Sequence, residues 1–285
     1  MTGRGNGEHG GVAAPSGLPV GDLLTSEPVT ADLPTPRRVL AVGAHPDDIE
    51  FGCGATLAKW VAGGAELHYV VLTDGSKGAW DAGADLAALV SARVGECRAA
   101  AAVTDGIDGG SPLPPERVFF MQRVDGELVN GADERRALAE IIRQVKPTVV
   151  LGHDPWRRYR LHPDHRVAGH ITVDALVAAR DHHFFPELGL APHRPRSLLL
   201  WEADAPNHVE DARGFEQTKI DALLCHHSQL ESTMGFDDLQ GEGATLHGSP
   251  AAVAEFSAKV RRQLAQHGSI CDLPSAEAFR LITDL

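Results

Sequence analysis

The sequence predicts a single α/β domain built on a mostly parallel sheet that is flanked by helices. After residue 37, apolar strand-like runs alternate with helix-like segments, which is the rhythm of βαβ units. Two His-Pro-Asp segments, at 45–47 and 162–164, come after predicted strands. Open parallel sheets bind ligands at the carboxyl ends of their strands, so both segments are expected near one site.

The predicted elements are separated by clear stop signals. Gly63 and Gly64 end the first helix, and Pro147 ends a later helix just before a buried strand. Strands are expected at 39–44, 66–73, 117–123, 148–152 and 197–202. Helices are expected at 55–62, 86–103, 133–145, 215–226 and 250–267, with a loop at 106–115 and a short terminal piece at 276–282.

The first 36 residues differ in composition from the rest of the chain. Residues 1–36 are rich in Gly, Pro and Ser and lack an apolar segment after a basic start. This composition predicts a flexible lead-in that is neither a secretion signal nor a membrane anchor. Residues 37–285 are expected to form one domain, and no stretch in them approaches the ~20 apolar residues of a membrane span.

Charge and cysteine content narrow the partners and the compartment. A formal net charge of −13 argues against nucleic acid as a partner and favours a neutral or cationic small substrate. The four cysteines lie too far apart for a zinc knuckle or a dense disulfide framework, so the cytoplasm is the expected location. We interpret Cys53, close to the first motif, as a packing thiol rather than a ligand. The sequence leaves a homo-oligomer open.

Two related tetrapeptides carry the strongest functional signal, His-Pro-Asp-Asp at 45–48 and His-Pro-Asp-His at 162–165. In each, ligand-capable side chains stand at positions i and i+3, and the intervening Pro fixes one backbone angle. Either segment alone could be a solvated turn, because Asp and Pro favour turns. Two copies, each following an apolar strand-like run, favour a metal site instead.

The residue types suggest a division of roles. A catalytic zinc ion usually has three protein ligands and one open position, and we predict His45, Asp48 and His165 as the ligands. Asp47 is then the candidate general base toward the attacking water. His162 would face it and stabilise an oxyanion or protonate the departing amine. The same ligand set also suits iron, cobalt or nickel.

Other polar residues near the motifs receive weaker assignments. Glu50 and Asp164 are expected to orient a ligand or to hold a loop. His153 and Asp154 also follow a strand, and a loop role is favoured over a fourth ligand or an outer carboxylate. The run at 157–160, Arg-Arg-Tyr-Arg, could grip an anionic group or form a solvated loop, and the sequence does not decide between these.

With these motifs the chain resembles the PIG-L/LmbE-like family of metal-dependent N-acetylglucosaminide deacetylases. The likeness spans about residues 38 to 282. Its segments are Ala44–Glu50 and His162–His165, then Gly52–Leu57, Leu72–Gly78, Arg93 with Glu96, and His226 with Ser228 and Gln229. The resemblance implies a Rossmann-like fold with zinc on the three predicted ligands and the same base and acid.

The resemblance also implies roles that the spacing alone does not give. Arg93, Lys77 and Gly78 would contact the substrate, and His226 would support the site from outside. Members that act on the mycothiol precursor typically carry an acidic residue after the matching glycine and a Tyr two positions before the second motif. Ala79 and Arg160 hold those positions here. Whether Tyr159 or Arg160 assists the oxyanion therefore stays open.

The sequence thus predicts a zinc-dependent N-deacetylase for an N-acetylglucosamine-type amino sugar or its conjugate, a small-molecule substrate. One alternative is an amidase that cleaves a larger N-acyl group or a thiol-cofactor conjugate with the same centre. Another is a sugar-binding protein without turnover, although binding alone needs neither the Asp47 base nor the His162 acid. The physiological substrate and the metal leave no readable pattern in one chain.

Overall fold

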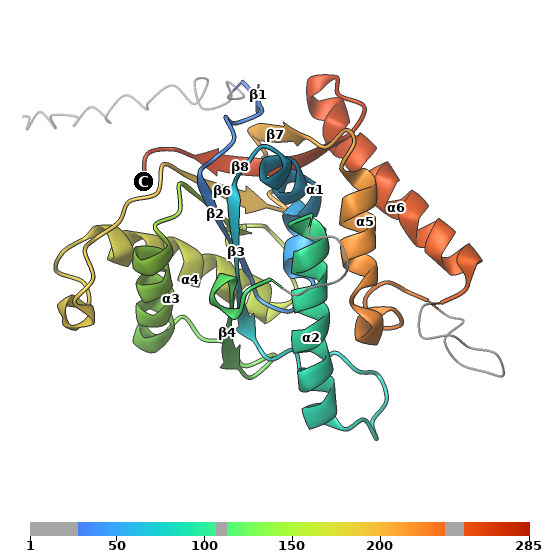
Figure 1. Cartoon of the computed structure of the whole chain (residues 1–285), viewed down its shortest axis with the longest axis horizontal. Coiled ribbons are helices and arrows are strands. Elements are labelled where there is room, and N and C mark those ends of the chain that lie inside the picture. Colours follow the sequence, from blue (N-terminus) through green and yellow to red (C-terminus); the bar gives the residue numbers. More distant parts are fainter. Residues whose placement is uncertain (1–27, 107–112, 237–247) are drawn as a thin grey trace, which may run out of the picture.

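A mixed β-sheet forms the centre of the molecule and carries helices on both faces (Figure 1). The computed structural model describes residues 28–106, 113–236 and 248–285. In these ranges the strands are β1 (Thr30–Ala31), β2 (Arg38–Gly43), β3 (Glu66–Thr73), β4 (Val118–Arg123), β5 (Val149–His153), β6 (Ser197–Trp201), β7 (His208–Asp211) and β8 (Ala276–Ile282). They form one sheet in the order β1-β7-β8-β6-β5-β2-β3-β4.

Most neighbouring strands in this sheet run in the same direction. Strand β2 pairs in parallel with β3 on one side and with β5 on the other, and the pairs β3–β4, β5–β6 and β1–β7 are also parallel. Strand β8 runs antiparallel to β6 and to β7. The predicted α/β class with a mostly parallel sheet is confirmed, and the short terminal piece expected at 276–282 is this antiparallel strand.

The helices form a layer on each face of the sheet. They are α1 (Asp48–Ala62), α2 (Leu86–Thr104), α3 (Ala132–Val145), α4 (Pro163–Arg180), α5 (Glu216–Leu224) and α6 (Pro250–Gly268). Single 3-10 turns are described at Pro115–Arg117, Pro186–Leu188, His227–Gln229 and Ser269–Cys271. Helices α1 and α2 pack on one face, with α5 and α6 beside them, and α3 and α4 pack on the other (Figure 1).

Alternation along the central strand explains why both faces are covered. In β2, Val39 and Ala41 join the core under α1 and α2, whereas Leu40 and Val42 join the core under α3 and α4. Successive side chains of a strand point to opposite faces, so an uninterrupted apolar run needs a helix on each side. This is the arrangement expected for the inner strands of a parallel sheet.

The order of the strands places a crevice between β2 and β5. From β2 the chain adds β3 and β4 on one side of the sheet, and it then crosses to add β5 and β6 on the other side. The loops that leave β2 and β5 therefore diverge to opposite faces. Such a switch point, at the carboxyl ends of the strands, is where ligands bind in open α/β sheets.

Two helix predictions were wrong at the motifs. The first helix begins at Asp48 rather than at 55, and its backbone is non-helical at Cys53. Gly52 and Gly54 flank that break and lower the helix propensity of this segment, so the sequence did not predict the start of the helix. No helix was expected after the second motif, but α4 begins there, with Pro163 at its start, where a proline is well tolerated. Residues 169–173, Gly-His-Ile-Thr-Val, are weak helix formers, and burial against the sheet outweighs that preference.

Part of the predicted lead-in is ordered. Thr30 and Ala31 form β1, which pairs with β7, a strand that the sequence reading also missed. Both are very short, so neither leaves a clear alternating pattern. Residues 1–27 of the lead-in, and 107–112 of the loop expected at 106–115, lie outside the described residues. Among the described helices, none combines the length and the apolar character needed to cross a membrane.

Candidate metal centre

The site lies at the switch point between β2 and β5. Strand β2 ends at Gly43, and His45 and Asp48 follow directly, with Asp48 as the first residue of α1. Strand β5 ends at His153. The first turn of α4 brings His165 to the same place from a distant part of the sequence.

The three predicted ligands come together with their donor atoms facing one another. Nδ1 of His45 lies 3.2 Å from Oδ2 of Asp48 and 3.1 Å from Nε2 of His165. The Nε2 atom of His165 lies 3.2 Å from Oδ1 of Asp48. Ligand atoms about 2.1 Å from a tetrahedral zinc ion are themselves about 3.4 Å apart. Each of these three distances, two of which end on different oxygens of Asp48, is close to that value.

The other nitrogen of His45 faces two carboxylates. Nε2 of His45 lies 3.3 Å from Oδ2 of Asp164 and 3.3 Å from Oδ1 of Asp125. Asp164 is fully buried and accepts hydrogen bonds from the backbone N–H groups of Gly126, at 2.6 Å, and Leu128, at 3.3 Å. A carboxylate on the far nitrogen fixes the ring and leaves Nδ1 for a metal. Asp164 thus contacts a candidate ligand, and its role in orienting that ligand stays a prediction.

The charges in the cluster suit a cation. Burial opposes charge on His45, yet Asp48, Asp125 and Asp164 raise the pKa of its imidazole well above the ordinary value. Burial likewise opposes charge on Asp48, yet His165, His153 and His45 hold the pKa of its carboxyl well below the usual range. A proton on His45 occupies the electrostatic place that a metal ion would take, so metal binding is expected to release that proton.

Two residues of the cluster, His153 and Asp125, were not predicted from the sequence as part of the site. His153, for which a loop role was favoured, is buried, and its Nε2 lies 3.2 Å from Oδ2 of Asp48. Its Nδ1 accepts a hydrogen bond of 3.0 Å from the indole of Trp201. Its place as the last residue of a central strand is the signal that could have found it. Asp125, in the loop after β4, carried no motif and was not singled out.

Donor atoms also cluster in other combinations. In the described part of the chain, three sets of side chains bring their ligand atoms within 4.8 Å of one another. These sets are His45 with His162 and His165, Asp48 with His153 and His165, and His45 with Asp125 and Asp164. The sets share residues, and they describe one continuous cluster around His45 and Asp48 rather than separate sites.

The candidate base Asp47 is buried beside the ligands in a strained conformation. Its φ angle is 121°, in a region that non-glycine residues rarely adopt. Burial raises the pKa of its carboxyl to about 6, and the nearby Arg93 opposes that rise. Nη2 of Arg93 lies 3.4 Å from Oδ1 of Asp47. A carboxyl with a raised pKa, held next to the ligands, is well placed to accept a proton.

Arg93 is tied to the protein on several sides. Its guanidinium donates to the carbonyls of Gly75, at 2.9 Å, and Pro46, at 2.7 Å, and it is 3% exposed. Gly78 packs against it, because a Cβ at that position would approach Nη1 of Arg93 to 2.5 Å. The structure thus shows Arg93 joining the loop that carries Asp47 to the loop after β3, whereas its contact with a substrate stays a prediction.

The candidate acid His162 precedes α4 with its side chain exposed. Its ring centre lies 4.6 Å from that of His45 and 4.6 Å from that of His165. Burial, His45 and His165 all lower its pKa, so the free ring is expected to be neutral at neutral pH. Negative charge that develops beside it during a reaction would raise that pKa and draw a proton to the ring.

Glu50 and His226 form a fully buried pair behind the site. Oε2 of Glu50 lies 3.3 Å from Nε2 of His226. Burial lowers the pKa of His226, but Glu50 and Asp47 raise it above the ordinary value. Both side chains are inaccessible and neither is within reach of the open surface. They lie behind the first turn of α1 and near the charge of Asp47, and their role in supporting the site stays a prediction.

Two hollows meet at the candidate ligands. One, of about 330 Å³, is lined by Lys77, Gly78 and His162 among other residues. The other, of about 250 Å³, is lined by aromatic side chains of Phe51 and Trp201 and by polar neighbours. Both include Asp47, Asp48, His165 and Thr233 in their walls. Lys77 itself pairs with Glu127 at 2.9 Å.

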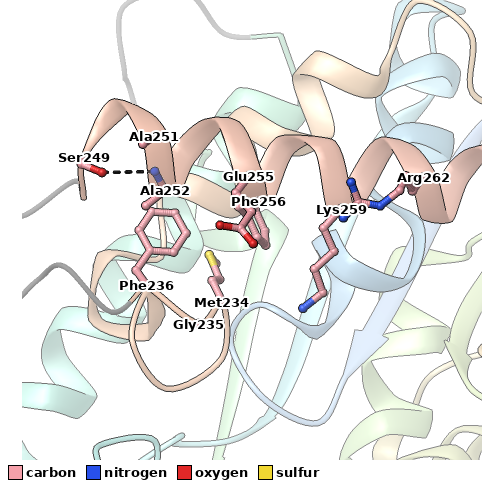
Figure 2. Close-up of a pocket in the computed structure, with 10 residues that line it drawn as sticks. All are labelled: Met234, Gly235, Phe236, Ser249, Ala251, Ala252, Glu255, Phe256, Lys259 and Arg262. Carbon is pink, nitrogen blue, oxygen red and sulfur yellow. Dashed lines mark hydrogen bonds between the residues drawn. The ribbon is translucent and has the colours of Figure 1, made fainter.

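A separate hollow of about 390 Å³ lies beside α6 (Figure 2). Phe236 and Met234 stand on one side of it, across from Phe256 and Glu255 of the helix. The side chain of Ser249 caps the helix by accepting a hydrogen bond of 3.1 Å from the N–H of Ala252. None of the candidate ligands lines this hollow.

The arginine run after β5 is paired with acidic residues of the β6–β7 region. Arg157 lies 3.2 Å from Glu202, and Arg158 lies 2.9 Å from Asp204. Arg160 contacts both Glu202 and Nδ1 of His165. Tyr159 is 92% exposed, away from the ligands. Of the two residues left open for the oxyanion, Arg160 is therefore the one that lies at the site.

The same family is found by comparison with known proteins. Residues 40–176 match the family model PIG-L, described as GlcNAc-PI de-N-acetylase. A diacetylchitobiose deacetylase of Thermococcus kodakarensis is 30% identical over 197 residues, which cover 68% of this chain and 70% of that protein. The chain belongs to the PIG-L family.

A second relative of this PIG-L protein is a 1D-myo-inositol 2-acetamido-2-deoxy-alpha-D-glucopyranoside deacetylase of Thermomonospora curvata. It is 36% identical over 170 residues, which cover 52% of this chain and 54% of that protein. The match thus spans about half the length of that relative. These likenesses alone identify neither the catalytic residues nor the substrate of this chain.

Solved structures resemble this PIG-L protein in fold. An N,N'-diacetylchitobiose deacetylase from Pyrococcus horikoshii superposes with a TM-score of 0.73 at 24% identity, covering 87% of this chain and 84% of that one. A 4-carboxy-2-hydroxymuconate hydratase from Pseudomonas putida superposes with a TM-score of 0.65 at 20% identity, covering 86% of this chain and 96% of that one. Because a hydratase shares the fold, the activity has to be argued from the site.

Proposed function

We propose that this PIG-L protein is a metal-dependent hydrolase that removes the N-acetyl group from an N-acetylglucosamine-type amino sugar or its conjugate. The single observation that carries the proposal is the meeting of His45 Nδ1, His165 Nε2 and the carboxylate of Asp48, each pair of groups within 3.2 Å, next to the buried carboxyl of Asp47. The relatives named above act on N-acetylated sugars, which supports the same substrate class.

The chain's own residues divide the work of amide hydrolysis. His45, Asp48 and His165 would hold a divalent cation, which would supply a Lewis acid for the amide carbonyl and for water in the site. Asp47 accepts the proton of the attacking water, and Arg93 keeps its carboxylate in place. His162, beside the candidate ligands, takes up a proton from solvent as negative charge develops on the carbonyl oxygen, and stabilises that oxyanion. It passes this proton to the amide nitrogen as the C–N bond breaks, and Asp47 returns the proton of the water to solvent.

Zinc is the proposed metal, because two imidazoles and one carboxylate are a common catalytic zinc set with one position left open. Iron, cobalt or nickel would accept the same donors. The buried carboxylates on the far side of His45 favour a divalent cation in general and do not discriminate between these metals. Elemental analysis of the purified protein identifies the resident ion.

The substrate class can be tested with a panel of N-acyl sugars. We expect acetate release from N-acetylglucosamine or its glycosides, and we expect chelation to abolish it and zinc to restore it. Release of longer acyl groups at higher kcat/KM would favour the amidase alternative. Sugar affinity without any product after long incubation would instead favour a binding protein and would overturn the proposal.

Replacing Asp164 by Asn is expected to weaken metal binding by about 10- to 100-fold, because the amide cannot hold His45 as the carboxylate does. Competition with a chromogenic chelator measures this affinity. Asp174→Asn is the matched control, since Asp174 lies on the same helix but pairs with Asn130 and Arg135 away from the site. Equal affinities of the two variants would contradict the orienting role of Asp164.

A further inference from the structure

Helix α1, which begins with the candidate ligand Asp48, is broken in its first half. Cys53 has φ −152° and ψ 19°, which are not helical values. In a continuous helix the N–H of Ala55 would donate to the carbonyl of Phe51, and the N–H of Thr56 to that of Gly52. A break inside a buried helix leaves such groups in need of other partners.

Two charged side chains from elsewhere in the fold bind the backbone at this break. The carboxylate of Glu277, in β8, accepts from the N–H groups of Ala55, at 3.2 Å, and Thr56, at 2.8 Å. The ammonium of Lys219, in α5, donates to the carbonyl of Phe51 at 2.7 Å. Lys219 and Glu277 also pair with each other at 2.5 Å. The break is thus held on its donor side and on its acceptor side.

Stability alone does not explain this pair. Lys219 is 4% exposed and Glu277 is 1% exposed, so both charges are removed from water. The cost of that removal commonly matches or exceeds the attraction within the pair, and apolar side chains of similar size stabilise a core at least as well. Apolar side chains, however, cannot bind the N–H and C=O groups that the break exposes. The backbone contacts are therefore the specific contribution of the pair.

The two glycines that flank the break are in close contact with side chains from other elements. A Cβ at Gly52 would lie 2.5 Å from the indole ring of Trp201, and a Cβ at Gly54 would lie 3.3 Å from Cγ of Lys219. Trp201 in turn binds His153, which faces Asp48. The short first part of α1 is thus confined between Trp201 and Lys219.

We propose that Lys219 and Glu277 are positioning residues for the metal centre, which fix the break in α1 and thereby the turn that presents Asp47 and Asp48. The link is short, because the backbone of residue Phe51 connects them: its carbonyl accepts from Lys219, and its N–H donates to the carbonyl of Asp47 at 3.1 Å. This inference rests on the proposed function, since it gives the pair a role in metal binding.

The test compares Lys219→Met and Glu277→Gln with the matched control Lys59→Met. Lys59 lies in the second part of the same helix and pairs with Glu210 at 2.5 Å, but it does not touch the break. Zinc affinity of the metal-free proteins is measured by competition with a chromogenic chelator, and unfolding temperature is measured in parallel. We expect at least about tenfold weaker zinc binding in the first two variants and unchanged binding in the control.

Lower unfolding temperatures in all three variants with unchanged zinc affinity would overturn the proposal, because the pair would then serve stability alone. If Lys219→Met does not fold, Glu277→Gln decides. If the wild type binds no divalent cation, the proposed function fails, and hydrogen exchange at the amides of residues 51–56 then decides. Faster exchange in Glu277→Gln than in Lys59→Met supports positioning, and equal exchange overturns it.

Discussion

Asp47→Asn is expected to lower kcat for acetate release by about 10²- to 10⁴-fold and to leave metal content unchanged. Asn keeps the size of the side chain, so the strained backbone and the contact with Arg93 can persist. The amide cannot accept a proton at neutral pH, and the general base is lost. Steady-state kinetics on an N-acetylglucosaminyl substrate, together with elemental analysis, separates the two effects.

Asp105→Asn is the matched control for this prediction. Asp105 also faces an arginine, with Arg117 donating at 2.7 and 3.1 Å, but it lies at the end of α2 away from the ligands. Its replacement is expected to cost some stability and to leave kcat unchanged. Turnover by Asp47→Asn at the wild-type rate, or loss of its metal, would show that Asp47 is not a base but a ligand or a structural residue.

His165→Ala is expected to weaken metal binding by more than the 10- to 100-fold that is typical of changes outside the ligand set, and to reduce activity to that of the chelated wild type. The substitution removes one of three donor atoms, and the two that remain come from a single turn. Metal content after dialysis and acetate release after adding zinc measure the effect.

His170→Ala controls for the loss of an imidazole from the same helix. His170 lies in α4 with an exposed side chain, and its ring stands 6.2 Å from that of Trp156. Unchanged metal content and activity are expected in this variant. Full metal occupancy in His165→Ala would mean that the ion is held by another subset of the cluster, such as His45 with Asp125 and Asp164.

Much of the fold could be read from the sequence because apolar periodicity is strong in its central part. The strand expected at 66–73 is β3 with the same bounds, and β2 and β5 are each displaced by one residue. Elements were not predicted correctly where they are short or where glycines weaken the apolar periodicity. Strand β7 spans only His208–Asp211, and the part of α1 before the break at Cys53 is only five residues long, so neither reaches the length over which periodicity can be recognised.

The site could be predicted only as far as contiguous motifs reach. Asp48 and His165 stand at fixed spacing within such motifs, and the fold brings them together. Asp125 stands alone after β4, and its approach to His45 depends on how that loop crosses the end of the sheet. Glu277 and Lys219 carry no local signal either. Residues that act through packing between distant elements require the structure to be seen.

The backbone of the candidate base Asp47 is strained. A φ of 121° at a non-glycine residue costs on the order of 1–3 kcal/mol and persists only where surrounding contacts impose it. Here the guanidinium of Arg93 and the turn between β2 and α1 impose it. The strain keeps the Asp47 carboxylate beside the ligands while Asp48 begins the helix.

Anomalous diffraction at the zinc absorption edge, from crystals grown with zinc, tests the central claim most directly. We predict one strong peak about 2.1 Å from Nδ1 of His45, Nε2 of His165 and a carboxylate oxygen of Asp48. A peak coordinated by other side chains, or no peak at these three atoms, would contradict the account.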